Sequence, residues 1–270
     1  MEGSPSIADK LARLAELESD FQQALEVEKL EAMAEFAAGA GHEINNPLTV
    51  ISGRAQLLLR EETDPERRHA LALISAQAMR VYEMIADMML FARPPRPERQ
   101  PVELVKLIDE MVADLLPRCA RQETSIRRTG ESEPIFIEAD PVQLQVAFRA
   151  ICCNAMEALQ SGGHIEIGVE AAEMQADRLA AGGTASECLA AAGTAAREVH
   201  IRICDDGPGI KPEERRHIFD PFYSARQAGR GLGLGLSKAW RIVTNHGGRI
   251  EVSSPAGRGA VLTVTLPTAG

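Results

Sequence analysis

The stretch GHEINNPL at residues 41–48 places an imidazole, a carboxylate and an amide within two turns of an amphipathic helical pattern. Residues four apart share a helix face, so His42 and Asn46 point the same way, while Glu43 lies about 100° round the axis. A neutral imidazole offers a lone pair to a phosphoryl group without needing a strong base. A lone histidine on a helix face is more often structural, but these neighbours make His42 a candidate phosphoacceptor.

The same stretch is expected to be a weak part of its helix. Pro47 removes its own amide donor and frees the carbonyl of Glu43, at a cost of about 3 kcal/mol. Gly39 and Gly41 each cost about 1 kcal/mol relative to alanine. An ordinary kink is one interpretation, and a soft helix beside a nucleophile that must meet two different partners is the other.

Outward from this stretch, apolar residues recur every three or four positions over 8–60, which predicts one long amphipathic helix or two in series. Thr63, Asp64 and Pro65 supply a turn, an N-cap and a proline at the first position of a second helix. That helix ends at the proline-rich stretch 93–97, which cannot continue it. Two helices with one apolar stripe each form half of a four-helix bundle, so we expect a homodimer.

Beyond the proline-rich stretch the pattern changes to shorter elements. Helices are predicted at 102–116, 141–160 and 234–245, and strands at 124–128, 135–138, 164–170, 199–204, 249–253 and 260–266. This mixture, with mostly antiparallel strands, favours a two-layer α+β sandwich. The Ala/Gly-rich segment 171–197 is a poor core former and is expected to be an insertion on the hairpin between two strands.

The composition excludes several classes of protein. A net charge of −10 argues against a general nucleic-acid or anionic-membrane surface. No run of about 18 apolar residues or signal-like N-terminus is present, so we expect a soluble, cytoplasmic chain with no direct membrane insertion. The cysteines show no metal-ligand spacing and are expected to be reduced, several of them in the core: Cys119, Cys152, Cys153, Cys188 and Cys204.

Further motifs follow residues 41–48 along the chain. They are NAMEA at 154–158, DDGPGI at 205–210, IFDPFY at 218–223 and GRGLGLGL at 229–236. In this order they resemble the H, N, G1, F and G2 boxes of the sensor histidine kinases of two-component systems. A single glycine motif would be a weak signal, but five boxes in the family's order make coincidence a poor explanation.

The resemblance implies a multidomain α and α+β chain. A dimeric four-helix-bundle domain would be followed by a two-layer α/β sandwich, the ATP-binding fold shared by histidine kinases, DNA gyrase, Hsp90 and MutL. We divide the chain into a helical or coiled-coil extension at 1–30, a dimerisation and histidine phosphotransfer domain at 31–93, a Pro-rich hinge at 94–100 and a catalytic ATP-binding domain at 101–270.

The resemblance also implies roles for the residues of the first motif. His42 would take the γ-phosphoryl group of ATP on its Nε2 atom. Glu43 would act as the general base or as the carboxylate that orients the imidazole. Asn46 would position water when the enzyme dephosphorylates its partner.

For the nucleotide, the resemblance implies that Asn154 holds Mg²⁺ and that Glu157, one turn later, acts through metal-bound water. A helix cap or a solvent face is the alternative for this pair. Asp205 would accept a hydrogen bond from the exocyclic amine of adenine, with Gly207 and Gly209 letting the backbone pass close to the ring. Its neighbour Asp206 is expected to face solvent.

A phosphate cover is implied by the remaining motifs, because glycines before a helix present backbone amides to phosphate oxygens. Its expected members are Phe222, Arg226, Arg230, Gly231, Gly233, Gly235 and Leu236. The chain departs from the family at Ala150, where many members have a further asparagine, and at 224–226, where Ser-Ala-Arg replaces Thr-Thr-Lys but keeps a cation.

The sequence thus predicts an ATP-dependent histidine kinase that phosphorylates His42 and passes the group to an aspartate of a response regulator receiver domain. Two other classes compete with this prediction. One is a regulatory binding module that keeps the fold without the activity, and the other is a different ATPase of the same fold. The first motif and the lack of a large C-terminal domain count against the latter.

Overall fold

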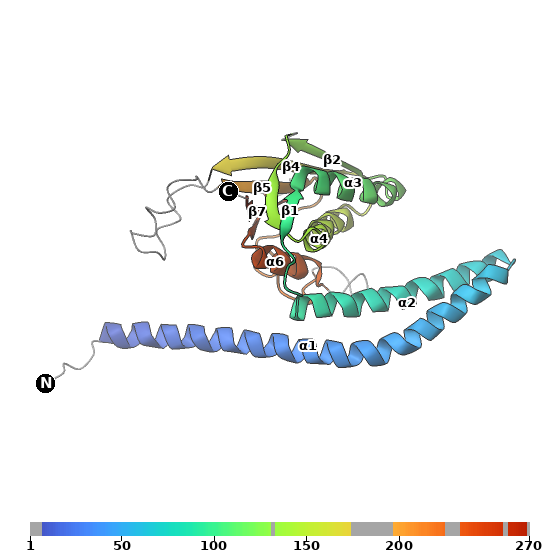
Figure 1. The fold of residues 1–270 in the computed structure, drawn as a ribbon, viewed down its shortest axis with the longest axis horizontal. Helices are drawn as coiled ribbons and strands as arrows, with labels where there is room; N and C mark the ends of the chain where they lie inside the picture. Colours follow the sequence, from blue (N-terminus) through green and yellow to red (C-terminus); the bar gives the residue numbers. More distant parts are fainter. Residues whose placement is uncertain (1–6, 131–132, 174–196, 225–232, 256–258, 269–270) are drawn as a thin grey trace. The chain divides into compact units, whose positions relative to one another are not determined.

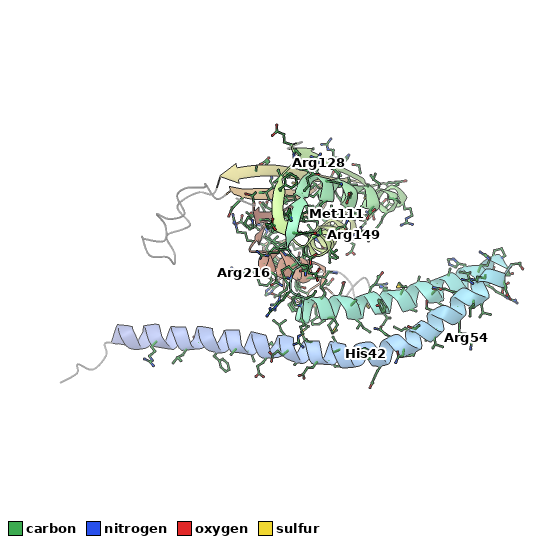
Figure 2. All side chains as sticks on the ribbon, viewed as in Figure 1. His42, Arg54, Met111, Arg128, Arg149 and Arg216 are labelled. Carbon is green, nitrogen blue, oxygen red and sulfur yellow. The ribbon has the colours of Figure 1, made fainter. Side chains whose placement is uncertain are left out.

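The chain forms two compact units, Met1–Pro94 and Pro95–Gly270, in a computed structural model that describes residues 7–130, 133–173, 197–224, 233–255 and 259–268 (Figure 1). The first unit is a hairpin of two helices, α1 (Ile7–Glu61) and α2 (Pro65–Ala92). Of the two possibilities left by the sequence, one continuous helix is therefore the one observed. Pro47 lies inside α1, and Figure 2 shows the helix bending between the labelled His42 and Arg54, as expected for a proline kink.

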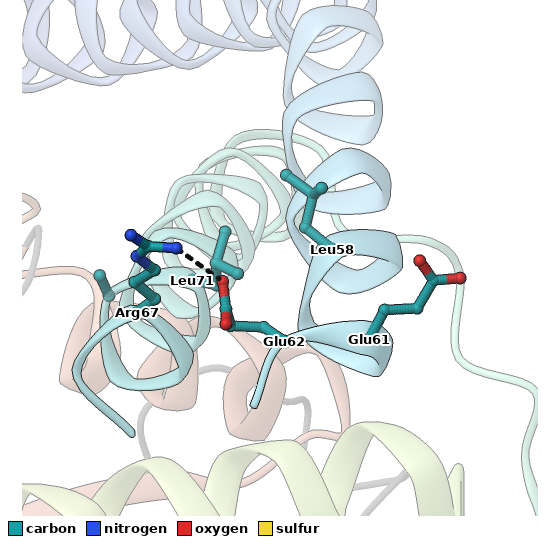
Figure 3. A pocket seen from close by; sticks show the side chains of 6 residues that line it. Leu58, Glu61, Glu62, Arg67 and Leu71 are labelled. Carbon is teal, nitrogen blue, oxygen red and sulfur yellow. Dashed lines mark ion pairs between the residues drawn. The ribbon is translucent and has the colours of Figure 1, made fainter. Parts of the chain in front are cut away.

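The turn between the helices is built from local hydrogen bonds. Asp64 is the N-cap of α2 and accepts from the backbone N–H of Arg67 at 2.9 Å, with Pro65 at the first helical position. Arg68 donates to the carbonyl oxygens of Leu59 (3.2 Å) and Glu62 (2.7 Å), and so satisfies the end of α1. Figure 3 shows a pocket at this end of the hairpin, with the Glu62–Arg67 ion pair (3.9 Å) on its wall.

Small residues fill the contact between α1 and α2. Ala34, Ala37, Ala55 and Ala78 are buried there, and a Cβ on Gly41 would lie 3.2 Å from Ile85 of α2. Gly41 therefore has a packing reason beyond local weakness. Large apolar side chains on the hairpin remain exposed instead: Ile44, Val50, Ile51, Leu57, Leu58, Leu73, Ile74 and Val81. None of the helices that the structure describes carries a stretch long and apolar enough to span a bilayer.

The second unit is a sheet of five strands with helices on one face. The bounds are α3 (Leu104–Arg121), β2 (Ser125–Gly130), α4 (Pro141–Leu159), β4 (His164–Glu173), β5 (Arg197–Asp205), α6 (Gly235–Asn245), β6 (Arg249–Ser253) and β7 (Ala260–Pro267). The strand order is β2-β4-β5-β7-β6, with β2 parallel to β4 and the other neighbours antiparallel. Figure 1 shows α3, α4 and α6 on one side of the sheet.

The core lies between these two layers. It is made of fully buried aliphatic and aromatic side chains from α3, α4 and the inward faces of the strands, among them Leu104, Ile108, Met111, Leu144, Phe148, Ile151, Ile165, Ile167, Ile201 and Ile203. Burial of such side chains contributes about 1.5–3 kcal/mol each. The two-layer sandwich predicted from the sequence is thereby confirmed.

Two details of the prediction were wrong. Residues 100–103 form a strand, β1 (Gln100–Glu103), which pairs antiparallel with β3 (Phe136–Ala139), so the next helix begins at Leu104 rather than at Val102. A short edge strand of this kind is set by its tertiary pairing and leaves no alternating pattern. The same helix continues through Pro117 to Arg121, because the ring of Pro117 lies on the exposed face.

The Ala/Gly-rich insertion connects the paired ends of two neighbouring strands. Strands β4 and β5 are antiparallel from Ile165 opposite Asp205 to Glu173 opposite Arg197. Residues 174–196 lie outside the described residues. The position of the insertion on a hairpin agrees with the expectation from the sequence, but its expected bounds of 171–197 were too wide. Residues 171–173 and Arg197 belong to the paired strands, because their register continues to the Glu173–Arg197 pair.

Candidate functional site

The candidate phosphoacceptor lies on the outer surface of α1. His42, Glu43 and Asn46 are all exposed, and Figure 2 labels His42 on this helix. Gly41 faces α2, so the next residue, about 100° further round the axis, is turned outward. The helix thus presents an imidazole, a carboxylate and an amide to solvent, where an incoming group can reach them.

In the second unit, Asp205 is the last residue of β5 and is 9% exposed. Its Oδ1 atom accepts a hydrogen bond from the backbone N–H of Gly207 at 3.0 Å, and Ala260 N lies 3.4 Å from the same atom. These bonds hold the carboxylate in one orientation at the end of a central strand. A Cβ on Gly207 would approach that same oxygen to 2.9 Å, so glycine is required for this geometry.

The following loop is held by Ser254 and Gly259, which the sequence analysis missed. The hydroxyl of Ser254 donates to the carbonyl oxygen of Gly259 (2.7 Å) and accepts from the N–H of Ile210 (2.8 Å). Gly209 has φ +77°, and a Cβ there would lie 2.7 Å from the Ser254 hydroxyl. A Cβ on Gly259, also at positive φ, would collide with the carbonyl of Asp205. The sequence did contain a signal for Gly259, because it is a glycine directly before the last predicted strand, 260–266.

The adjacent Asp206 has a structural role, because it bonds to the first residue of β4. It is exposed, as expected, and its carboxylate accepts from the backbone N–H of His164 at 2.7 Å and meets the His164 ring at 2.9 Å. The backbone hydrogen bond first, and then the ring, lower the pKa of Asp206. Asp206 thereby holds the start of β4 in place. Of the two aspartates in the DDGPGI motif, Asp205 therefore remains the candidate for recognition of the base.

Helix α4 carries the two candidate metal-site residues beside this loop. Asn154 is half-buried and Glu157 is exposed one turn later. A Cβ on Gly207 would lie 3.6 Å from both Ala158 and Leu159 of the same helix. The Asp205 loop and the end of α4 are therefore neighbours, although about fifty residues separate them in the sequence.

The donor set fits the Mg²⁺ ion that the sequence predicted. Among the described residues, no three His, Cys, Asp or Glu side chains form a group that could hold a metal alone. Mg²⁺ in nucleotide sites keeps several waters and phosphate oxygens and needs only one or two hard protein oxygens. The Asn154 side chain offers one hard amide oxygen of this kind, and Glu157 is placed one turn away.

The expected phosphate cover is described at its two ends. Gly233 has φ +68°, and a Cβ there would lie 2.5 Å from the carbonyl oxygen of Tyr223 and 2.7 Å from Phe222 C. The last two residues of the F motif, Phe222 and Tyr223, thus lie against Gly233 of the G2 motif. Phe222 itself is exposed, with φ +65°. Arg226, Arg230 and Gly231 lie outside the described residues.

Helix α6 begins at Gly235 directly after this contact, with Leu236 half-buried behind it. Its N-cap is Leu234, which makes no side-chain capping bond within the described structure. The first N–H groups of a helix carry a partial positive charge and suit an anion. Lys238, one turn on, is a buried cation that the sequence analysis did not select.

The described cysteines, Cys119, Cys152, Cys153 and Cys204, are free thiols. Cys119 and Cys152 are core residues, as expected. Burial raises the pKa of the Cys152 thiol, which keeps it protonated. Cys188 lies outside the described residues.

Two family models match the chain. The model described as "Histidine kinase-, DNA gyrase B-, and HSP90-like ATPase" matches residues 139–270, and the model described as "His Kinase A (phospho-acceptor) domain" matches residues 32–97. The first contains Asn154, Asp205 and the glycine motifs, and the second contains His42.

Curated proteins with similar sequences carry related descriptions. Sensor histidine kinase ZraS of Salmonella typhimurium is 32% identical over 241 residues, which are 89% of this chain and 47% of that protein. Signal transduction histidine-protein kinase AtoS of Escherichia coli is 30% identical over 242 residues, which are 90% of this chain and 36% of that protein. The chain thus spans less than half the length of these relatives.

Solved structures share the fold at lower identity. Full-length ShkA in complex with AMPPNP has a TM-score of 0.68 and 22% identity, over 87% of this chain and 46% of that one. Histidine kinase ThkA in complex with response regulator protein TrrA has a TM-score of 0.59 and 22% identity, over 93% of this chain and 66% of that one.

Proposed function

The chain belongs to the sensor histidine kinases of two-component systems, and from this premise we propose that it phosphorylates its own His42 from ATP and passes the phosphoryl group to an aspartate of a response regulator receiver domain. One observation carries the proposal above the others. The second unit brings Asp205, its glycine loop and the Asn154 helix together, while the first presents His42 on an exposed helix face.

Adenine recognition is assigned to Asp205. Its carboxylate is held by backbone donors at the end of β5 and accepts from the exocyclic amine of the base. Gly207 and Gly209 keep the following loop free of side chains, so the backbone approaches the flat ring. A fixed acceptor of this kind binds without paying for its own reorientation.

The triphosphate is assigned to the start of α6 and to the cover before it. The N–H groups at Gly235 and Leu236 face the anion, aided by the helix dipole. Phe222 and Gly233 hold the two ends of the cover, and Arg226, Arg230 and Gly231 belong to the part between them. Asn154 would hold Mg²⁺, with Glu157 acting through ordered water, and the ion when bound neutralises charge on the phosphate oxygens.

Transfer to the protein takes place at His42. Its Nε2 lone pair forms the N–P bond as the bond between the γ-phosphorus and the bridging oxygen breaks, and ADP leaves with those electrons. Glu43 accepts the imidazole proton or orients the ring. It is the next residue along the helix and lies about 100° round the axis from His42. Asn46, on the face of His42, orients water when phosphate is removed from the response regulator.

The exposed apolar residues of the hairpin support a homodimer. Ile44, Ile51, Leu58, Leu73 and Ile74 lie on one α1–α2 hairpin without cover from their own chain. A second hairpin would complete a four-helix bundle and bury them. In this arrangement the described part of the 1–30 extension, residues 7–30, continues the bundle helix. Residues 31–93 form the phosphotransfer domain, 94–100 the hinge and 101–270 the ATP-binding domain. All of them work in the cytoplasm, where ATP is supplied.

Labelling with Mg²⁺ and γ-³²P-ATP tests this function. Wild-type protein should acquire an acid-labile, base-stable phosphoramidate, which a binding module without activity would not form. His42→Gln should abolish the label and leave ATP binding intact. The matched control is His69→Gln, because His69 is an exposed histidine of the same hairpin. Label that survives in His42→Gln would contradict the assignment.

A further inference from the structure

The hinge is held to the ATP-binding unit by hydrogen bonds at Pro95, Glu98 and Arg99. The side-chain amide of Gln143 donates to the carbonyl oxygen of Pro95 at 3.1 Å. The backbone N–H of Glu98 donates to Asp140 Oδ2 at 3.1 Å. Arg99 Nη2 donates to the carbonyl oxygen of Asn245 at 3.1 Å. These bonds fasten residues 95–99 to the start of α4 and to the end of α6.

The two anchoring points are themselves joined by a buried histidine. His246 is the C-cap of α6 and is 2% exposed. Its Nε2 atom accepts from the backbone N–H of Asp140 at 3.0 Å, and its Nδ1 atom lies 2.8 Å from the carbonyl oxygen of Ile242. An N–H donor at one nitrogen and a carbonyl at the other require the neutral tautomer with hydrogen on Nδ1. Hinge, α4 and α6 thus form one closed hydrogen-bonded group.

Asp140 is the centre of this group. Besides the hinge N–H of Glu98, its carboxylate accepts from the N–H groups of Val142 and Gln143 and so caps α4. Burial alone would raise the pKa of Asp140, but the hydrogen bonds from the Gln143, Glu98 and Val142 backbones outweigh it and lower the pKa. The charged form is therefore the one that holds the hinge.

Gln143 holds the hinge from a buried position. Its side chain is 5% exposed, and its Oε1 atom has no hydrogen-bond partner among the described residues. An unsatisfied buried acceptor is destabilising, and an apolar side chain of equal size would avoid that cost. Within the described residues, the side-chain amide of Gln143 makes one hydrogen bond, the one to the carbonyl oxygen of Pro95.

We propose that Asp140, Gln143 and His246, here called the hinge clamp, are positioning residues that make the hinge part of the ATP-binding unit. The proposal rests on the proposed kinase function. With residues 95–99 held, the chain pivots where the hinge leaves the clamp, next to Pro94. The ATP-binding unit then searches for His42 with few free backbone bonds, which raises the effective concentration of the reactants.

Full-length variants test the clamp. Gln143→Met removes the bond to Pro95 without removing volume. His246→Leu removes both ring bonds, and His246→Gln restores an acceptor for the Asp140 N–H. Gln145→Met is the matched control, because Gln145 is on the same helix and has no part in the clamp. Two quantities are measured for each: hydrogen exchange of the backbone amides of Arg96, Glu98 and Arg99, and kcat and KM(ATP) for labelling of His42.

The clamp predicts faster exchange at Arg96, Glu98 and Arg99 in Gln143→Met and His246→Leu, and a kcat lower by about tenfold from misplacement of the reactants. KM for ATP should stay within about twofold, since the nucleotide contacts remain. His246→Gln should recover most of the rate, and Gln145→Met should match wild type.

Other results overturn the inference. Faster exchange with an unchanged kcat would show that a held hinge is not needed. A KM that rises in step with the loss of rate would show that these residues only support the nucleotide fold. If Gln143→Met left exchange unchanged, the clamp itself would be wrong. Exchange needs no kinase activity, so failure of the wild type to label His42 would overturn the proposed function while exchange still decided whether the clamp holds the hinge.

Discussion

Asp205 Oδ1 accepts the backbone N–H of Gly207 at 3.0 Å, so the carboxylate at the end of β5 is oriented by the chain that follows it. Gly259 packs against the carbonyl of Asp205 and Ala260 N lies near the same Oδ1 atom. The acceptor is thus fixed by groups from both sides of the loop. A preorganised acceptor of this kind recognises one hydrogen-bond donor in one direction.

Replacement of Asp205 by asparagine should weaken binding of an ATP analogue. A hydrogen bond to a charged group contributes roughly 1.5–3 kcal/mol, so the dissociation constant should rise about tenfold or more. Calorimetric titration measures it. Asp206→Asn is the matched control, because Asp206 bonds to His164 instead, and its affinity should stay near wild type. Equal affinities for wild type and Asp205→Asn would move the nucleotide site elsewhere.

Asn46→Ala should separate two activities. An amide orients water but takes up no proton near neutral pH, so most autophosphorylation of His42 should remain while dephosphorylation of the partner response regulator is lost. Both rates are followed with purified regulator. Thr49→Ala serves as control, since the Thr49 hydroxyl donates to the carbonyl oxygen of Asn45 at 2.8 Å, one helical turn back. Equal loss of both activities in Asn46→Ala would identify Asn46 as a support for the helix bent at Pro47.

The insertion should be dispensable. Glu173 and Arg197 face each other across β4 and β5, so a two-residue Asn-Gly turn in place of 174–196 closes a normal hairpin. Loop-closure entropy grows only with the logarithm of length. We expect the melting temperature and the labelling rate to stay near wild type, by calorimetry and by the His42 assay. A large fall in either would show that the insertion packs or signals.

The bidentate pair between Arg249 and Glu198 should make stability depend on pH. Arg249 of β6 donates from Nη1 to Oε1 and from Nη2 to Oε2 of Glu198 in β5, each at 2.9 Å. The hydrogen bond from Arg249 lowers the pKa of Glu198 despite partial burial. A lowered folded-state pKa stabilises the fold above the unfolded value, about 4.3, and that stabilisation is lost as pH falls through the folded value.

Glu198→Gln should therefore reduce the free energy of unfolding by about 1 kcal/mol at pH 7, a modest figure because the pair is partly exposed. Near pH 3 the variant and the wild type should converge. Urea unfolding at both pH values measures the difference. Glu251→Gln is the control, because Glu251 lies 3.7 Å from Arg249 Nε and is exposed. A difference that persisted unchanged at pH 3 would assign the effect to packing.

Local patterns predicted well wherever neighbours in the sequence decide the outcome. The N-caps Asp64 and Asp140 sit directly before prolines, and both start helices as expected. His246 before two glycines ends α6. Strand β1 was missed because its register is set by β3, 39 residues away at the Gln100–Ala139 pair, and four residues are too few to show alternation.

The sequence by itself determined the kinds of group available and their local placement: an imidazole, a carboxylate and an amide on one helix, an acidic residue before a glycine loop, and prolines that end a helical domain. Helical period, capping and backbone restriction act over a few residues, so they can be seen without the fold. Only the tertiary structure decided that Gly259 packs against Asp205, and that Asp140 meets His246 across 106 residues of chain. Such contacts depend on the path of the whole chain between two positions, and no local preference encodes that path.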